Sequence, residues 1–224
     1  MDIPIMTEER YQELMLIVNA FKAKQEAYKD TLAKVDIYIN LLEKSSYKPF
    51  TDDSQDYNVN LLAIRQTNTI TNLFDDKIVV FWKYKSKWTL KEYTCTTKPG
   101  TSYFYNSYIK RLGGVAMLVP GEYKYKLGLH QGRYKALRQA EPVNVYRLTK
   151  INESPLEATF GMSIKPLQSS INIHRSNPNA VSTRVNKWSA GCIVINEGYN
   201  DFMSIMKKSL SIYNNVTLRL IEIT

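Results

Sequence analysis

Two short stretches decide the fold and the chemistry, INIHR (171–175) and WSAGCIVI (188–195). In an extended INIH segment both isoleucines face one side, so Asn172 and His174 face the other. The glycine-containing turn before IVI lets backbone N–H groups near Gly191 and Cys192 converge on one point, as an oxyanion hole requires. An imidazole that takes the proton of a thiol creates a nucleophile, so Cys192 and His174 are candidates for a catalytic pair, although spacing alone is weak evidence for it. A cysteine that only packs in the core is the alternative.

Outside these stretches, short β-type runs separated by Gly or Pro predict a β-rich domain. In EYKYKLGL (122–129) tyrosines and leucines alternate with charged residues, which places the apolar residues on one face. The other runs are KIVVFWK (77–83), KWTLKEYTC (87–95), GGVAMLVPG (113–121), VNVYRL (143–148) and VTLRLIEI (216–223). Between Phe202 and Tyr213 apolar residues recur at helical spacing, which predicts a helix before the last strand.

The N-terminal region predicts one long helix. Residues 7–45 contain no Pro or Gly, and Thr7 followed by two glutamates is typical of a helix start. Apolar residues step alternately by four and three through Leu14, Val18, Phe21, Tyr28, Leu32, Val35, Ile39 and Leu42, with Gln25 as a polar interruption. Such a heptad row pairs helices. It predicts self-association, docking to another partner, or packing against the chain's own core.

The composition is that of a globular protein. The chain has 224 residues, 44% of them hydrophobic, with only nine Gly and eight Pro, which excludes a disordered tail and a collagen. It has no uninterrupted run of about 18 apolar residues, so we expect no membrane span. Residues 1–45 contain six basic and eight acidic side chains, so this segment has a net charge of −2. Because the whole chain has a net charge of +9, the remaining residues have a net charge of +11.

The basic remainder attracts polyanions, including nucleic acid and the acidic polymers of a bacterial envelope. Sixteen tyrosines add surface on which bases stack. Tyrosines also suit half-buried strands, however, and lysines solvate outer faces. We therefore do not expect a nucleic-acid partner.

The two stretches together resemble the catalytic motif of the L,D-transpeptidase (YkuD-like) family, in which a His precedes an S-H-G-C box. The upstream segments FDDKIVVF, TTKPG and GLHQGRYKAL are similar to the phage and prophage branch of that family and follow in the same order. The resemblance covers residues 61–213. It implies an L,D-transpeptidase-like β-rich catalytic domain that forms a thioester with peptidoglycan stem peptides and passes the acyl group to an amine or to water.

The resemblance also implies roles for individual residues. Cys192 is the implied nucleophile and His174 the implied base, with the imidazole oriented by the backbone around Arg175. The amides of Gly191 and Cys192 are implied to hold the oxyanion, and Ser189 to brace the turn. The candidates for substrate contacts are Arg175, Trp188 and His130.

Two positions depart from the family pattern, and they put the substrate and the transfer reaction in question. Ala190 stands where most members carry a second His, and Val194 where Arg or Asn is usual. A structural or surface histidine is the alternative at His130, and Cys95 is expected to be a packing residue with a free thiol. Because the sequence has no CxxC, HExxH or carboxylate cluster at metal spacing, we expect no metal and no cofactor.

These observations divide the chain into an N-terminal helical segment (1–45), a linker (46–60) and a catalytic domain (61–224). The N-terminus lacks a basic n-region and an apolar h-region, so no secretory signal is expected. The expected function is hydrolysis or L,D-transpeptidation of peptidoglycan peptides by a phage-encoded protein. We expect it in the virion, or in the host cytoplasm before release at the cell wall.

The alternative function is a non-catalytic virion structural or wall-binding module on the same fold. In either case the N-terminal helix is expected to contact a second copy or a virion partner, unless it packs on the chain's own domain.

Overall fold

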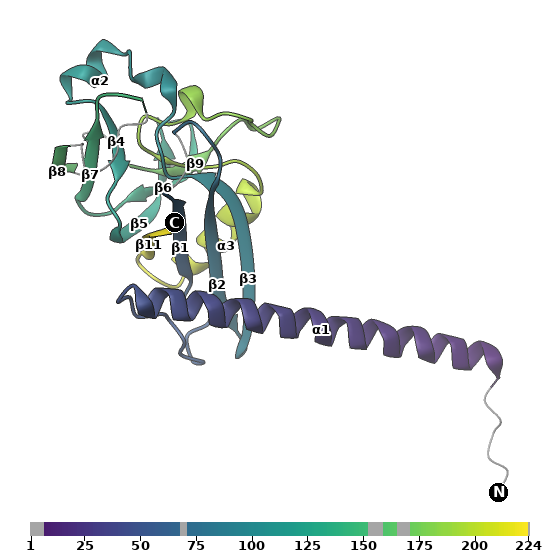
Figure 1. Cartoon of the computed structure of the whole chain (residues 1–224). Helices are drawn as coiled ribbons and strands as arrows, with labels where there is room; N and C mark the ends of the chain where they lie inside the picture. Colours follow the sequence, from purple (N-terminus) through teal and green to yellow (C-terminus); the bar gives the residue numbers. More distant parts are fainter. Residues whose placement is uncertain (1–6, 68–70, 152–158, 165–170, 224) are drawn as a thin grey trace, which may run out of the picture.

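The protein is a long helix attached to a β-rich body, as the computed structural model describes for residues 7–67, 71–151, 159–164 and 171–223 (Figure 1). Eight strands close a barrel in the order β1-β11-β5-β6-β9-β10-β3-β2. A separate three-stranded sheet has the order β4-β7-β8. The prediction of a mainly β fold preceded by a long N-terminal helix is therefore confirmed.

The elements have the following bounds. The barrel strands are β1 (Asn60–Gln66), β2 (Asp76–Tyr84), β3 (Lys87–Thr96), β5 (Gly121–His130), β6 (Tyr134–Gln139), β9 (Ile173–Arg175), β10 (Ile193–Ile195) and β11 (Val216–Ile223). The separate sheet contains β4 (Val115–Leu118), β7 (Val143–Leu148) and β8 (Thr159–Ile164). The helices are α1 (Glu8–Lys44), α2 (Ser107–Arg111) and α3 (Tyr199–Leu210), with short 3-10 turns η1 (Thr101–Tyr103) and η2 (Asn186–Trp188). None of the helices in the described part of the chain has the length and apolarity needed to cross a bilayer.

Strands β1, β2 and β11 are buried on both faces, which explains their nearly continuous apolar sequences. One face of each points into the barrel core, where Leu61 and Ile78 lie. The opposite face, which includes Leu62 and Val79, packs under α1. The predicted apolar face of α3, which includes Phe202, also contributes to the barrel core.

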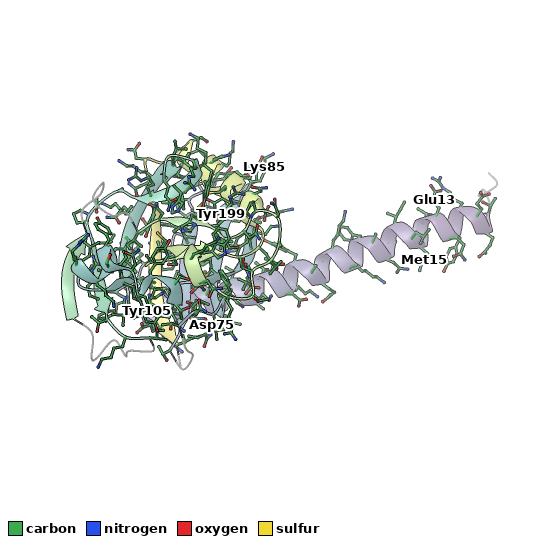
Figure 2. All side chains as sticks on the ribbon, turned by 90° about the horizontal axis from the view of Figure 1, so that it is seen from above. Glu13, Met15, Asp75, Lys85, Tyr105 and Tyr199 are labelled. Atoms are coloured by element: carbon green, nitrogen blue, oxygen red, sulfur yellow. The ribbon has the colours of Figure 1, made fainter. Side chains whose placement is uncertain are left out.

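The two ends of α1 have different surroundings. The helix begins where the sequence predicts, with the Thr7 hydroxyl accepting a hydrogen bond from the Arg10 N–H at 3.3 Å. Val35 and Leu42 are fully buried against the barrel, so the C-terminal half packs on the chain's own domain. The N-terminal half extends away from the body into solvent, and Phe21 there is 61% exposed (Figure 1, Figure 2). Within the described residues, the rest of the chain thus covers the heptad row along only part of its length.

The β5–β6 hairpin extends beyond the barrel and carries His130 at its tip. Strand β5 pairs with β11 as far as Tyr125 and with β6 as far as His130. Because the pairing with β11 ends at Tyr125, Leu127 and Leu129 are 37% and 41% exposed, whereas Tyr125 is fully buried. The apolar face expected along this strand is therefore buried only in its first part. The two residues after His130 have positive φ, as a type I′ hairpin turn requires.

Replacing Leu42 with Ala should lower the free energy of unfolding by about 2–5 kcal/mol, because the change leaves a cavity between α1 and the barrel. Ile37 on the same helix is 61% exposed, so Ile37→Ala should change that free energy by less than about 0.5 kcal/mol. Urea denaturation followed by circular dichroism measures both variants. Equally small effects would contradict the docking of this half of α1.

Candidate active site

The pairing of β9 with β10 brings His174 next to Cys192. The two strands run parallel, in a register that places Val194 opposite His174. Cys192 immediately precedes β10, and its Sγ accepts a hydrogen bond from the Asn172 backbone N–H at 3.4 Å. A ring nitrogen of His174 and the sulfur of Cys192 lie within 4.8 Å of each other. The structure therefore brings together the two residues that the sequence analysis paired.

The orientation of the His174 ring is fixed through Nδ1. This nitrogen lies 2.7 Å from the Arg175 carbonyl oxygen and 3.2 Å from the Tyr134 hydroxyl. A carbonyl oxygen only accepts, so Nδ1 carries the proton and donates it. Nε2 then has a lone pair, and it is buried without a hydrogen-bond partner among the described residues. An imidazole in this tautomer is ready to act as a general base.

His130 is the third member of the cluster. Its ring stacks on the His174 ring, with centroids 3.8 Å apart and planes 22° from parallel. Its Nδ1 lies 3.0 Å from the side-chain Nδ2 of Asn172. Asn172 and His174 thus both face His130, on the side away from the buried isoleucines that flank them. The sequence offered His130 as a substrate contact or a structural residue, whereas the structure places it directly against the imidazole of the pair.

A tight turn holds Cys192. The Ser189 hydroxyl donates to the Cys192 carbonyl oxygen at 2.7 Å and accepts from the Gly191 N–H at 3.0 Å. Ser189 therefore braces this turn. Gly191 has φ +149°, and a Cβ at this position would lie 2.6 Å from the Cβ of Ala116. Since the Gly191 N–H is bonded to Ser189, it would have to leave that bond to take the oxyanion role that the resemblance implies.

Segments distant in sequence hold the same turn from two sides. The Ser189 carbonyl accepts from the Gly100 N–H, and the Ala190 carbonyl accepts from the Ala116 N–H, both at 2.9 Å. A Cβ at Gly100 would lie 1.9 Å from the Asn186 carbonyl oxygen, so a glycine is needed where the segment after β3 passes η2. The position of Cys192 therefore depends on the segment after β3 and on β4.

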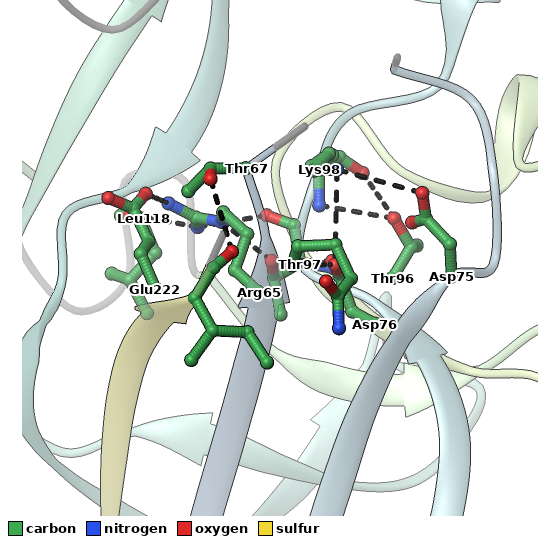
Figure 3. A network of polar contacts seen from close by, with 11 residues as sticks. Arg65, Thr67, Asp75, Asp76, Thr96, Thr97, Lys98, Leu118 and Glu222 are labelled. Carbon is green, nitrogen blue, oxygen red and sulfur yellow. Dashed lines mark hydrogen bonds and ion pairs between the residues drawn. The ribbon is translucent and has the colours of Figure 1, made fainter. Parts of the chain in front are cut away.

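A buried polar network fixes the segment that leads to Gly100 (Figure 3). Arg65 is 2% exposed and donates from Nε to the Thr97 hydroxyl at 2.7 Å. Asp76 accepts from both the N–H and the hydroxyl of Thr97, each at 2.7 Å. Burial raises the pKa of Asp76, although Lys98 and the Thr97 hydrogen bonds act in the opposite direction. Replacing one charged residue of such a network with an uncharged one leaves the charge of its partner buried and unpaired.

Burial keeps both members of the pair uncharged. Removal from water, together with the smaller effect of the neighbouring His130, lowers the pKa of His174 to about 3, against the opposing hydrogen bond to Arg175. Burial raises the pKa of Cys192 to about 11, although the Asn172 N–H acts to lower it. Near neutral pH the resting site is thus a thiol beside a neutral imidazole. A proton has to pass from sulfur to nitrogen as the sulfur attacks.

The other two predicted substrate contacts are Arg175 and Trp188. The Arg175 guanidinium lies 4.5 Å from the centre of the Tyr134 ring, and Arg175 also lines a cavity of about 390 Å³ together with Tyr199. Trp188 is half-buried at the end of η2, with the Lys187 ammonium 5.9 Å from its ring centre. Sequence reasoning missed Tyr134, although the motif GLHQGRY places it across the hairpin turn from His130.

The described residues that offer metal ligands at this site are His130, His174 and Cys192, whose ligand atoms lie within 4.8 Å of one another. An imidazole binds a metal along the lone pair of its nitrogen, in the plane of the ring. The rings of His130 and His174 are stacked, so their nitrogen lone pairs lie in nearly parallel planes. The two lone pairs therefore do not point at one common position. Coordination of one ion by all three residues requires one ring to turn out of the stack.

No family model, curated protein or solved structure matches this chain. Its chemistry therefore has to follow from the site. A half-buried thiol beside an imidazole with a free Nε2 can attack a carbonyl carbon and hold the acyl group as a thioester.

The reaction of Cys192 with iodoacetamide should accelerate about tenfold per pH unit between pH 7 and pH 10, because only the thiolate reacts and its pKa is raised to about 11. Mass spectrometry of the labelled peptides follows each cysteine separately. Cys95 is free, fully buried and has a raised pKa, so it should stay unlabelled in the folded protein. A rate for Cys192 that is already constant at pH 7 would reveal a resting thiolate and contradict the neutral pair.

Replacing Gly191 with Ala should destabilise the protein by more than the same change at Gly132. Both glycines have positive φ, but a Cβ at Gly132 meets nothing within 4 Å, whereas a Cβ at Gly191 would lie 2.8 Å from the Ala116 carbonyl oxygen. Backbone strain alone costs about 1–3 kcal/mol, and only Gly191→Ala adds the clash. Thermal unfolding compares the two variants, and equal losses would contradict the close contact with β4.

Proposed function

We propose that this protein is a cysteine-nucleophile enzyme that acts on the stem peptides or crosslinks of peptidoglycan. The observation that carries the proposal is the His174 imidazole, which donates through Nδ1 to the Arg175 carbonyl and lies with a ring nitrogen within 4.8 Å of the Cys192 sulfur. Its Nε2 has no hydrogen-bond partner among the described residues. This combination gives a nucleophile, a base and a group that orients the base.

The reaction proceeds in two halves. The Cys192 sulfur attacks the carbonyl carbon of a peptide bond while its proton passes to His174 Nε2, and a tetrahedral oxyanion forms. The oxyanion collapses, the C–N bond breaks, and the leaving amine takes the proton from the imidazolium, which leaves a thioester. Water or an amine then attacks the thioester carbonyl carbon and gives up its proton to His174. The C–S bond breaks, and the sulfur takes the proton from the imidazolium, which restores the thiol and releases the acyl product.

The substrate class rests on the resemblance of INIHR and WSAGCIVI to the L,D-transpeptidase motif, together with charge. The chain after residue 45 carries +11, which attracts the acidic polymers of a bacterial envelope. We propose hydrolysis as the main outcome, because a phage benefits from cutting crosslinks, with L,D-transpeptidation as the second. In this proposal the protein reaches the wall from the virion or on release from the host cytoplasm.

A non-catalytic wall-binding or virion structural module is the second candidate. The uncharged resting pair favours it, since neither group is poised as an ion at neutral pH. Ala190 and Val194, which replace polar residues of the family pattern, favour it as well. Two observations favour the enzyme. The chain has both Cys192 and His174 of the family motif, and hydrogen bonds from Ser189, Gly100 and Ala116 hold the turn that carries Cys192.

Incubation of the full chain with purified peptidoglycan fragments, followed by mass spectrometry of the muropeptides, tests the proposal. The wild type should change at least one peptide, and Cys192→Ala should abolish the change because no thioester can form. His174→Ala should reduce the rate by about 100-fold to 10,000-fold, the usual contribution of a general base. Carrying out the reaction in H₂¹⁸O separates hydrolysis, which labels the new carboxylate, from transfer to an amine.

Cys95→Ala is the matched control, because it removes the other thiol from the barrel core and leaves the site unchanged. It should keep the activity. A wild type that changes no muropeptide, yet still binds intact sacculi, would establish the wall-binding module instead.

A further inference from the structure

The N-terminal part of α1 presents an apolar surface that the rest of the described chain does not cover. Docking on the body begins at Tyr28, whose hydroxyl accepts from the Trp88 N–H at 3.3 Å. Residues 8–27 before it are exposed, apart from the half-buried Met15. Of the large apolar side chains that are exposed in the described chain, six lie in this short segment: Tyr11, Leu14, Leu16, Ile17, Val18 and Phe21. Figure 2 shows this part of the helix, with Glu13 and Met15, standing clear of the body.

This surface continues a row that already packs. Val35 and Leu42 of the same heptad row are fully buried against the barrel. Further towards the N-terminus, Leu14 and Val18 are each 40% exposed, and Phe21 is 61% exposed. A helix that stands alone in water gains little from its own propensity and is stabilised by packing of an apolar face. Packing of the exposed part of the row against another helix would therefore stabilise the N-terminal half of α1.

The charges on either side of the apolar block are opposite. Residues 8–13 contain three glutamates and Arg10 and carry −2. Residues 14–21 carry no charge, and residues 22–29 contain three lysines and Glu26 and carry +2. Among the described residues, the ion pairs of these two blocks are Arg10–Glu13 and Lys29–Glu26, each exposed and within one block. Each end of the segment is thus complementary to the opposite end of a second copy.

We infer that residues 8–24 of α1 pair antiparallel with the same residues of a second copy of this chain. An antiparallel arrangement places the acidic block of one copy against the basic block of the other, whereas a parallel one places like charges together. Antiparallel helices pack an a position against a d position. Tyr11 then packs against the partner's Phe21, and Leu14 against the partner's Val18. This register ends before Tyr28, so the partner helix stays clear of the barrel.

Light scattering of the full chain at micromolar concentration tests the association. The mass should be twice the 25.9 kDa of one chain. Phe21→Ser should weaken association by about 100-fold or more, because both copies lose a buried aromatic side chain. Ile37→Ser is the matched control, since Ile37 is 61% exposed on the same helix, as Phe21 is, and lies outside the pairing segment. A wild type with the mass of one chain would overturn the inference.

Disulfide trapping tests the orientation in chains that carry Cys192→Ala. The variants Tyr11→Cys and Phe21→Cys should form few dimers when each is oxidised alone and should form a mixed disulfide when combined. In an antiparallel pair with this register the two copies of residue 11 lie about 15 Å apart along the helix axis, too far for a disulfide. Efficient trapping of Tyr11→Cys with itself would establish a parallel pair and overturn the proposed arrangement.

Discussion

The parallel pairing of β9 with β10 is the constraint on which the site depends. It places the strand that carries His174 beside the strand that Cys192 precedes, although a polar loop and η2 separate them along the chain. The pairing leaves the imidazole free to bond through Nδ1 to the carbonyl of Arg175, the next residue, so Nε2 keeps its lone pair. The Cys192 thiol and the His174 imidazole lie close together because the two short strands β9 and β10 pair side by side.

This geometry is maintained because segments distant in sequence form hydrogen bonds to the turn before β10. The turn receives one backbone hydrogen bond from Gly100 and one from Ala116. The segment that carries Gly100 is fixed in turn by Arg65 and Asp76, two buried charges that share Thr97 as a partner (Figure 3). Buried charges are costly unless paired, so a network of this kind tolerates few alternative arrangements. The position of Cys192 thus depends on strands that carry neither Cys192 nor His174.

The long helix follows a different rule. Its 37 residues span about 55 Å, whereas a ten-residue barrel strand such as β3 spans about 33 Å. One apolar row therefore packs on the barrel around Val35 and passes beyond it around Phe21. The sequence predicts the helix and its row correctly because both follow from local spacing. Which part of the row the body covers depends on the size of the barrel.

Local chemistry in the sequence determined α1, α3, β11 and the shared face of Asn172 and His174, because each follows from the spacing of apolar residues along one element. Strand β1 was not predicted, because NLLAIRQ is buried on both faces and so lacks polar–apolar alternation, and its single β-branched residue is Ile64, whereas several Val, Ile and Thr residues mark β2 and β11 as strands. Only the tertiary structure decided that His130 stacks on His174 and that the Gly191 N–H is bonded to Ser189. It also decided that thiol and imidazole are uncharged. These properties arise from contacts between distant strands and from exclusion of water, which local spacing does not encode.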